Sequence, residues 1–346
     1  MRAVTVRPGI ANSVALAAVP EPAVGEGAVV ARALALGICG TDREIIAGLY
    51  GWAPPGADHL ILGHESLGRV LEMPEGSGFA KGDLVAGIVR RPDPVPCPAC
   101  AQGAWDMCRN GQYTERGIKE RHGYGSELFR VEPDFLIKID PKLGLLGVLL
   151  EPTSVVAKAW EHVHRIGTRA HAWQPRCALI TGAGPIGLLA AMIGVQQGLD
   201  VHVLDRKTAG PKPGLVRALG ATYHNAFDDL CPDIVLECTG ASPIVLDVLD
   251  RAAPDGVICL TGVSSGGRNF PFDVGAHNRN MVLQNHVVFG SVNANRRHYA
   301  AAADALAMAD PKWLERLVTR RVPLSRWQEA FERRPDDIKV VLDFTL

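Results

Sequence analysis

The alternation of hydrophobic and polar residues divides the chain into two regions of different character. In roughly the first 140 residues, short strand-like stretches end at glycine, proline or charged turns. They span residues 1–6, 28–36, 68–72 and 84–90. A helical pattern then begins at Gly147 and runs toward Arg165. We therefore expect the first region to consist mainly of β-structure.

The second region alternates short apolar strands with helices. Its predicted strands cover residues 177–181, 200–204, 234–238, 257–262 and 287–290. Strands separated by helices are typical of a parallel sheet with crossover helices. From about residue 300 the pattern is helical, and a final strand over residues 340–344 is expected to pack back onto the first region.

Length and composition agree with this division and exclude several classes of protein. A chain of 346 residues suggests two domains. With 47% hydrophobic and 21% charged residues it should bury a large core, which excludes disordered, fibrous and small disulfide-bonded proteins. Lys and Arg (36) nearly balance Asp and Glu (37), so no nucleic-acid or anionic-membrane partner is predicted.

The apolar runs are too short to span a membrane, and the first segment is unlike a signal peptide. Both observations favour the cytoplasm. The eight cysteines are therefore expected to be ligands or buried thiols.

A glycine-rich loop follows the first predicted strand of the second region. Gly182-Ala-Gly184-Pro185-Ile186-Gly187 matches G-x-G-x-x-G between an apolar strand and an apolar helix, as dinucleotide binding requires. Gly182 permits the tight turn, Gly184 lets the backbone approach a pyrophosphate, and Gly187 lets helix and strand pack closely. The helix N-terminus then faces the anion. An ordinary strand–turn–helix is the alternative.

Residues after the next strand give conflicting signals about the cofactor. Asp205 is placed to accept hydrogen bonds from the adenosine ribose, which favours NAD. Arg206 and Lys207 follow at once and could hold the 2′-phosphate of NADP, or could simply form a solvated turn. NAD, NADP or both are therefore expected. Further expected cofactor-binding residues are Thr261, Gly262, Val292 and Asn293.

Two residues of the first region, and one in the helical segment that follows it, are candidate ligands of a metal with an open coordination position. Cys39 and His64 offer sulfur and nitrogen, and Glu151 is a carboxylate inside an apolar run, where an unpaired charge would be costly. Each residue also has a simpler explanation. Cys39 could be a small buried residue, His64 a hydrogen-bonded core histidine, and Glu151 a carboxylate at a helix N-terminus.

The order of GICGTD, GHE, a cysteine cluster and the glycine loop resembles the zinc-dependent medium-chain dehydrogenase/reductase superfamily over essentially the whole chain. RRPDPVPCPAC, TERGIKERHGYGSE, LLEPTSVVAKAWE and GSVNANRRHY resemble its glucose 1-dehydrogenase branch. The resemblance implies an α/β fold with two domains. Residues 1–160 and 294–346 would form a GroES-like, mainly β catalytic domain, and residues 161–293 a Rossmann domain with a doubly wound parallel sheet. It also implies a homodimer or homotetramer.

The resemblance also implies roles for individual residues. Cys39, His64 and Glu151 would surround a catalytic zinc, and Glu65 would exchange onto the metal or bind its water. Thr41 would hydrogen-bond the substrate oxygen. Sugar contacts are implied for Glu115, which otherwise looks like a solvated loop acid, and for Asn293, which could equally serve the nicotinamide.

A second cysteine cluster, Cys97-x2-Cys100-x7-Cys108, has the spacing of a structural zinc site but only three thiols. Asp93 could be the fourth ligand. Another group could complete the site, or the cluster could hold no metal. The other cysteines, on or beside apolar strands, are expected in the core: Cys177, Cys231, Cys238 and Cys259.

These expectations combine into one reaction, the NAD(P)-dependent oxidation of an aldose at C1, most simply D-glucose to its lactone. Zinc would lower the pKa of the anomeric hydroxyl, and the proton would leave through Thr41, or through Glu65 and a water. A zinc dehydrogenase of a polyol or another secondary alcohol is the alternative. A non-catalytic cofactor-binding protein is a third possibility, because a fold does not fix a function.

Overall fold

The computed structural model describes residues 1–227, 229–264, 266 and 269–346. The chain forms two compact units: unit 1 comprises Met1–Ser154 and Ala294–Leu346, and unit 2 comprises Val155–Asn293. The first division falls inside helix α3 (Leu150–Gly167), a few residues before the expected boundary at residue 160.

Unit 1 is built mainly of β-strands. In its largest sheet the strand order is β11 (Leu136–Lys138), β6 (Leu84–Gly87), β5 (Glu65–Glu72), β3 (Val29–Ile38), β19 (Lys339–Asp343) and β18 (Val318–Pro323), and β10 (Leu128–Val131) also pairs with β3. Two smaller sheets have the orders β2-β1-β4 and β7-β8-β9, with strands β1 (Arg2–Val6), β2 (Ala15–Ala18), β4 (Leu60–Ile61), β7 (Arg90–Arg91), β8 (Thr114–Arg116) and β9 (Glu120–Arg121). The unit's α-helices are α1 (Gly40–Ile46), α2 (Pro98–Ala101), α8 (Arg296–Met308), α9 (Pro311–Leu317) and α10 (Gln328–Phe331), together with the first turn of α3.

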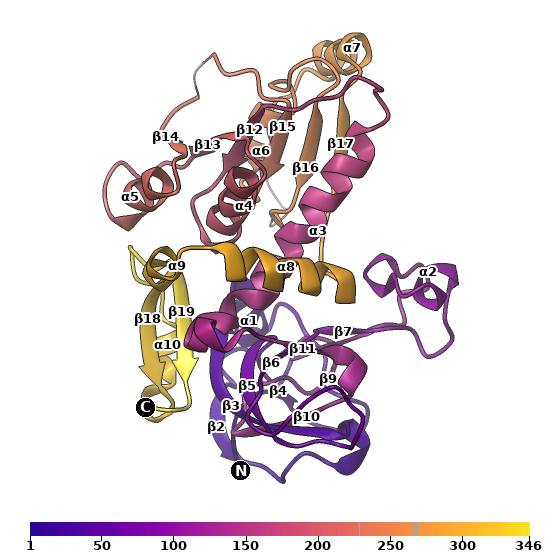
Figure 1. Ribbon diagram of the computed structural model, residues 1–346, viewed down its shortest axis with the longest axis vertical. Helices are drawn as coiled ribbons and strands as arrows, with labels where there is room; N and C mark the ends of the chain where they lie inside the picture. The colour runs from indigo at the N-terminus through magenta and orange to yellow at the C-terminus, as the bar shows by residue number, and fades with distance from the viewer. Residues whose placement is uncertain (228, 265, 267–268) are drawn as a thin grey trace. The chain divides into compact units, whose positions relative to one another are not determined.

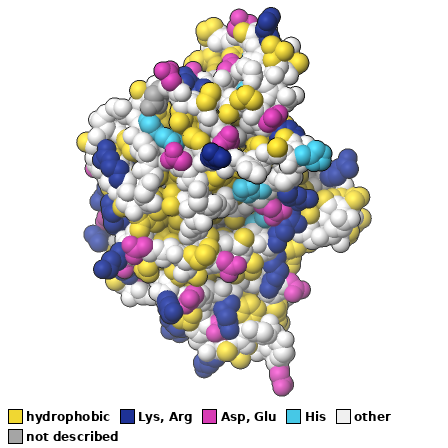
Figure 2. Space-filling view, turned by 45° about the horizontal axis from the view of Figure 1, so that its top comes forward, with side chains coloured by type: hydrophobic (Ala, Val, Ile, Leu, Met, Phe, Trp, Pro, Cys, Tyr) yellow, Lys and Arg dark blue, Asp and Glu magenta, His cyan; other side chains and the backbone are white. Residues whose placement is uncertain are grey.

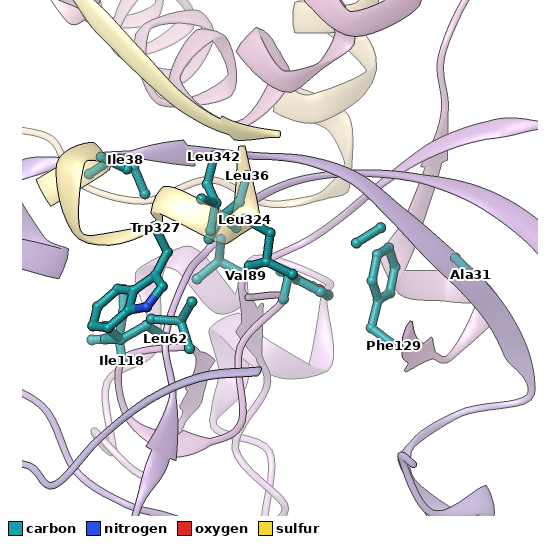
Figure 3. Packing of buried hydrophobic residues seen from close by; sticks show 14 of the residues in the cluster. Ala31, Leu36, Ile38, Leu62, Val89, Ile118, Phe129, Leu324, Trp327 and Leu342 are labelled. Carbon is teal, nitrogen blue, oxygen red and sulfur yellow. The ribbon is translucent and has the colours of Figure 1, made fainter. Parts of the chain in front are cut away.

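Residues from both ends of the chain form the core of unit 1. Figure 3 shows Leu36 and Ile38 of β3 beside Leu342 of β19, with Leu324 and Trp327 close by. Strand β19 is antiparallel to β3, with Val340 opposite Ile38, so the C-terminal segment completes the sheet begun by the N-terminal one. This pairing agrees with the expectation that the chain returns to its first region.

Strand β18 differs from the expectation of helix after residue 300. Its sequence VTRRVP carries two arginines, so apolar periodicity gives it no strand signal. In the structure Arg320 pairs with Asp337, and Arg321 pairs with Asp343 of the neighbouring strand. Ion pairs therefore accompany a strand that the hydrophobic pattern alone did not predict.

Unit 2 is a six-stranded sheet in which all strand pairs are parallel (Figure 1). The order is β14 (Thr222–His224), β13 (Asp200–Leu204), β12 (Cys177–Thr181), β15 (Ile234–Glu237), β16 (Val257–Leu260) and β17 (Val287–Gly290). Its helices are α4 (Pro185–Gln196), α5 (Pro211–Ala218), α6 (Ser242–Val248), α7 (Val274–Gln284) and most of α3. The order reverses between β12 and β15, so the carboxyl ends of these strands mark the expected ligand crevice of a doubly wound sheet.

Helix α3 starts later than the sequence pattern indicated. Residues Pro141–Leu149 form a 3-10 segment interrupted at Gly144, and the α-helix begins at Leu150 rather than Gly147. The combined segment Pro141–Gly167 is long and apolar enough to cross a membrane, but 78% of its most apolar window is buried inside the protein. That burial is typical of a core helix.

Charges of both signs are mixed on the surface. On the face that Figure 2 presents, blue basic and magenta acidic side chains are interspersed. This agrees with the nearly equal numbers of basic and acidic residues in the sequence.

Candidate functional site

Cys39 is held at the start of helix α1. It is the N-cap residue, and its Sγ accepts a hydrogen bond from the Thr41 N–H (N–S distance 3.3 Å). Asp42 closes the capping box, because its Oδ2 accepts the Cys39 N–H at 2.9 Å. Thr41 is half-buried in the first turn of the same helix. The tetrapeptide Cys39–Asp42 thus fixes the thiol by local geometry.

His64 and Glu65 lie where the chain enters β5. Gly63 precedes them with φ of +96°, a left-handed conformation that favours glycine. One ligand atom each from Cys39, His64 and Glu65 lies within 4.8 Å of the other two. We call these three residues the site cluster. Because Nδ1 of His64 lies 3.4 Å from Asp42 Oδ1, the other ring nitrogen is left available for a ligand bond.

The Glu65 carboxylate is also bound by a residue from the other end of the chain. Lys339 Nζ, at the start of β19, lies 2.7 Å from both carboxylate oxygens, and both side chains are buried. Gly37 makes room for the acid, since a Cβ there would lie 2.0 Å from Glu65 Oε2. Lys339 on β19 and Gly37 on the neighbouring strand β3 therefore fix the position of the Glu65 side chain.

Glu151 faces the site cluster from the first turn of α3. Desolvation raises the pKa of its carboxyl to about 7; among the nearby charges, His64 lowers it and Glu65 raises it. Its carboxylate is not among the three ligand groups within 4.8 Å of one another. A cation among these groups would favour the ionised form of Glu151.

The donor set fits a zinc ion. A thiol, an imidazole and carboxylates are the ligand types of catalytic zinc sites. In the described part of the chain, Asp42 Oδ1 and His64 Nδ1 are buried with no hydrogen bond of good geometry, although they lie close together. Two buried polar atoms without hydrogen bonds are costly, and a cation bound by the other nitrogen of His64 would make Nδ1 a donor toward Asp42.

Asp42 and Lys339 were not found by sequence reasoning. Asp42 had a detectable signal, because it stands three residues after Cys39 with the spacing of a capping box. Lys339 had none, since it lies 274 residues from Glu65 and only the β3–β19 pairing brings it close.

The second cysteine cluster also comes together. The Sγ atoms of Cys97, Cys100 and Cys108 lie within 4.8 Å of one another, around the short helices α2 and Trp105–Met107. Hydrogen bonds from the Arg109 and Cys100 N–H groups lower the pKa of Cys97 to about 6, whereas desolvation raises that of Cys100 to about 11. We call this segment, residues 93–109, the thiol lobe.

Asp93 lies near the thiols but outside the close set. Its Oδ1 accepts the Val95 N–H at 2.8 Å. Its Oδ2 is buried with no hydrogen-bond partner among the described residues. An orphaned buried carboxylate oxygen is compatible with a ligand role, while the present distances bring only the three thiols together.

The other cysteines only partly meet the expectation of core positions. Cys259 is buried, and Cys177 and Cys238 are half-buried. Cys231 is exposed, so that prediction is wrong for it: the residue lies in the loop before β15 rather than on the strand.

Glu115 is not the solvated loop acid that its sequence context alone suggested. It lies on β8 with only 5% of its surface exposed. Its Oε1 accepts a hydrogen bond from Arg90 Nε at 3.0 Å, and the Arg90 guanidinium also covers the Tyr113 ring. The carboxylate is therefore fixed in a buried ion pair.

The glycine loop of unit 2 has the geometry that its motif predicts. Gly182 has φ of +88°, and a Cβ on Gly187 would lie 1.7 Å from the Gly182 carbonyl oxygen. Gly184 caps α4, with Pro185 and Ile186 in the first turn, and a Cβ on Gly184 would meet no atom within 4 Å. The backbone is thus open to a ligand at Gly184 and closely packed at Gly187.

Asp205 has several partners besides any ribose. Its Oδ2 accepts the Ala183 N–H and an ammonium hydrogen of Lys212, both at 2.8 Å, and its Oδ1 accepts the Lys207 N–H at 3.0 Å. Arg206 is exposed beside it. Lys212, on α5, was not identified from the sequence, and it partly neutralises the acid that suggested NAD.

A buried carboxylate organises the carboxyl end of β15. Glu237 Oε1 accepts hydrogen bonds from Thr181 Oγ1 (3.2 Å) and the Thr239 N–H (2.7 Å). The Glu237 carbonyl accepts the N–H groups of Thr261 and Gly262. Thr261 and Gly262 therefore lie at the sheet edge where a dinucleotide is expected.

Val292 and Asn293 follow the carboxyl end of β17. The Val292 side chain is 59% exposed, and Asn293 has φ of +62°. The Val292 carbonyl accepts a hydrogen bond from the buried Lys158 ammonium.

Comparison with known proteins gives consistent matches to both units. Residues 25–141 match the family described as Alcohol dehydrogenase GroES-like domain, and residues 144–344 match Glucose dehydrogenase C-terminus. The chain is 41% identical to a glucose 1-dehydrogenase of Thermoproteus tenax and 38% identical to one of Methanocella arvoryzae, over 99% of both chains in each case. It is also similar to the solved structure of Haloferax mediterranei glucose dehydrogenase in complex with NADP, Zn and gluconolactone. That match has a TM-score of 0.91 and 34% identity, and covers 100% of each chain.

Proposed function

The chain belongs to the glucose 1-dehydrogenase family of zinc-dependent medium-chain oxidoreductases, and we propose that it oxidises an aldose at C1, with D-glucose as the substrate and a lactone as the product. The observation that carries this proposal is the site cluster, in which His64 and Glu65 are buried and Cys39 is half-buried, together with Glu151 facing it. It occurs in one chain with a glycine loop of dinucleotide-binding geometry.

Cys39 and His64 are the proposed fixed zinc ligands. Glu65 and Glu151 are the alternative carboxylates for the third protein ligand. The two differ in that Lys339 already balances the charge of Glu65. When bound, Zn²⁺ lowers the pKa of a coordinated hydroxyl, and the nicotinamide accepts a hydride. Asp42 Oδ1, which lies 3.4 Å from His64 Nδ1, is the proposed acceptor that orients the ring when the metal is bound, as an outer carboxylate does in many metal sites.

The remaining steps fall to Thr41 and Glu115 of unit 1 and to Asn293, the last residue of unit 2. We propose that the anomeric proton leaves through the Thr41 hydroxyl, in the first turn of α1, which accepts it while passing its own proton on to water. Glu65 and a water are the other route. Glu115 is the proposed sugar contact, and its ion pair with Arg90 holds its carboxylate in one orientation. Asn293 is a second proposed contact for the sugar or the nicotinamide.

For the cofactor, we propose use of both NAD and NADP with NADP favoured. The bond from Lys212 to Asp205 weakens the acid as a ribose acceptor, and Lys212, Lys207 and Arg206 concentrate positive charge where a 2′-phosphate would lie. Lys212→Met should lower the ratio of kcat/KM for NADP over NAD about tenfold. An unchanged ratio would exclude Lys212 from the selection.

The thiol lobe is proposed to hold a structural zinc through Cys97, Cys100 and Cys108, with Asp93 Oδ2 as the fourth ligand. The low pKa of Cys97 and the crowding of three thiols support a bound cation.

Assembly and location complete the proposal. Strand β17 lies at the edge of its sheet, and the neighbouring helix α7 carries exposed Val274, Val282 and Leu283, which supports a homo-oligomer, either a dimer or a tetramer. Eight free cysteines support a reducing compartment such as the cytoplasm.

A substrate panel tests the proposed reaction. Initial rates of reduced-cofactor formation are measured with D-glucose, D-galactose, D-xylose and sorbitol at equal concentration. The proposal expects the aldoses to react and sorbitol to be poor. A preference for sorbitol would reassign the protein to polyol oxidation.

A further inference from the structure

Lys158 is a buried cation that the proposed reaction does not use. It lies on α3 within unit 2 with 1% of its surface exposed. Its Nζ donates a hydrogen bond of 2.8 Å to the backbone carbonyl of Val292. Burying an ammonium group costs several kcal/mol, and an apolar side chain of similar length would fill the same space without that cost. A stabilising role alone therefore explains the lysine poorly.

The carbonyl that Lys158 binds lies in a constrained segment. Ser291 is joined to β16, because its N–H donates to the Leu260 carbonyl at 2.9 Å. Two residues later, Asn293 adopts a left-handed conformation with φ of +62°, which a residue other than glycine rarely adopts without support. Between them, the Val292 side chain points outward. Lys158 thus fixes the peptide plane at the centre of a three-residue turn.

The strand order places this turn in the nicotinamide half of the cofactor site. The glycine loop follows β12 and Asp205 follows β13, so the pyrophosphate and adenosine lie on that side of the sheet. The other half of a dinucleotide then extends over β15, β16 and β17. Residues 291–293 follow β17, at the far end of that half.

We propose that Lys158 is a positioning residue that holds the 291–293 turn in the conformation that receives the nicotinamide. The inference rests on the proposed function, because it assumes a nicotinamide dinucleotide in unit 2. It differs from a purely structural role in one consequence. Loss of the Lys158 hydrogen bond affects ligands that carry a nicotinamide and spares ligands that end at the ribose.

The test compares two ligands on purified full-length protein. NADPH affinity is measured by its fluorescence, and the affinity of 2′-phospho-ADP-ribose, which lacks the nicotinamide, by displacement of NADPH. For Lys158→Met we expect about tenfold weaker NADPH binding and an unchanged affinity for the fragment. Lys158→Arg, which can still donate to the carbonyl, should recover part of the loss.

Trp160→Phe is the matched control. It removes another buried hydrogen bond of α3, from Trp160 Nε1 to the Ala190 carbonyl at 3.1 Å, and that carbonyl belongs to α4 rather than to the 291–293 turn. It should lower stability without changing the ratio of the two affinities. If Lys158→Met fails to fold, Lys158→Gln gives the same comparison with a neutral donor and an intermediate expected loss.

Two outcomes overturn the inference while leaving the proposed function intact. In one, both ligands weaken equally in Lys158→Met, as a structural role requires. In the other, neither affinity changes. If the wild-type protein binds neither ligand, the proposed function and this inference both fail.

Discussion

The site cluster and the thiol lobe contain similar ligand atoms in very different surroundings. The ligands of the site cluster come from the β3–α1 junction and the start of β5, inside a large hydrophobic core, and Lys339 already balances one of their charges. The thiol lobe has only a four-residue helix and a 3-10 turn. Its tie to helix α8 includes the hydrogen bond from Asn295 Nδ2 to Asp106 Oδ1. A metal bound by the site cluster should therefore serve catalysis, and a metal bound by the thiol lobe should stabilise the local fold.

The largest expected effect separates activity from folding at the site cluster. Cys39→Ala or His64→Ala should lower kcat/KM by roughly a thousandfold or more, because the metal lowers the activation barrier by several kcal/mol. The melting temperature should fall by only a few degrees, because Cys39 caps a single short helix and the surrounding sheet does not depend on the thiol or the imidazole. Turnover, zinc content and circular dichroism are measured together. Full activity in metal-free His64→Ala would contradict the zinc mechanism.

The glycine loop and the site cluster differ in how far the sequence could predict them. The glycine loop is contiguous, so Gly182, Gly184 and Gly187 can be assigned from their spacing and context alone. The site cluster depends on distant segments, and the resemblance supplied the grouping of Cys39, His64 and Glu65 that strand pairing then brings together.

Ion pairs between charged residues on different elements were the hardest to predict. Lys339 and Lys212 look like surface lysines in the sequence, yet one binds Glu65 and the other Asp205. Strand β18 was missed for a similar reason, because Arg320 and Arg321 mask its strand pattern. Periodicity reports which face of an element is buried, and it carries no information about ion pairs between one element and another.

The second largest effect tests whether Lys339 balances the charge of the Glu65 carboxylate in the absence of metal. Lys339→Met should lower the free energy of unfolding by about 3 kcal/mol, because it leaves the Glu65 carboxylate buried without its cation. Adding Glu65→Gln should recover part of that loss. Denaturant titration of both variants decides the question. Equal stability of the single and double variants would show that the ion pair is not what stabilises this region.

A smaller effect is expected in the thiol lobe, where loss of a ligand should lower stability and leave activity nearly unchanged. Cys100→Ala should remove one zinc per chain and lower the melting temperature by a few degrees, roughly the effect of 1–2 kcal/mol in a protein of this size. It should leave kcat within about twofold. Limited proteolysis should then cleave within residues 93–109. Unchanged zinc content would show that the lobe holds no metal.

The smallest effect lies outside both clusters and serves as a reference. Burial opposes ionisation of Asp337, but hydrogen bonds from Arg320 and the Arg334 N–H hold the pKa of its carboxyl below the usual value. The stability that this provides is complete above the unfolded pKa, near 4, and is lost as the pH falls through the lower folded value. Asp337→Asn should therefore cost about 1 kcal/mol at pH 7 and nothing in strong acid. Urea titrations at several pH values check this, and a constant difference across the acid range would contradict it.

Metal-dependent turnover of D-glucose tests the central claim most directly. Protein of known zinc content is assayed with D-glucose and NADP, then stripped with a chelator, and then reloaded with Zn²⁺. We predict a rate that disappears with removal of the metal and returns with it, while circular dichroism shows that the secondary structure of the whole chain is retained. A full rate in the stripped protein would contradict the assignment of Cys39, His64, Glu65 and Glu151 as a catalytic zinc site.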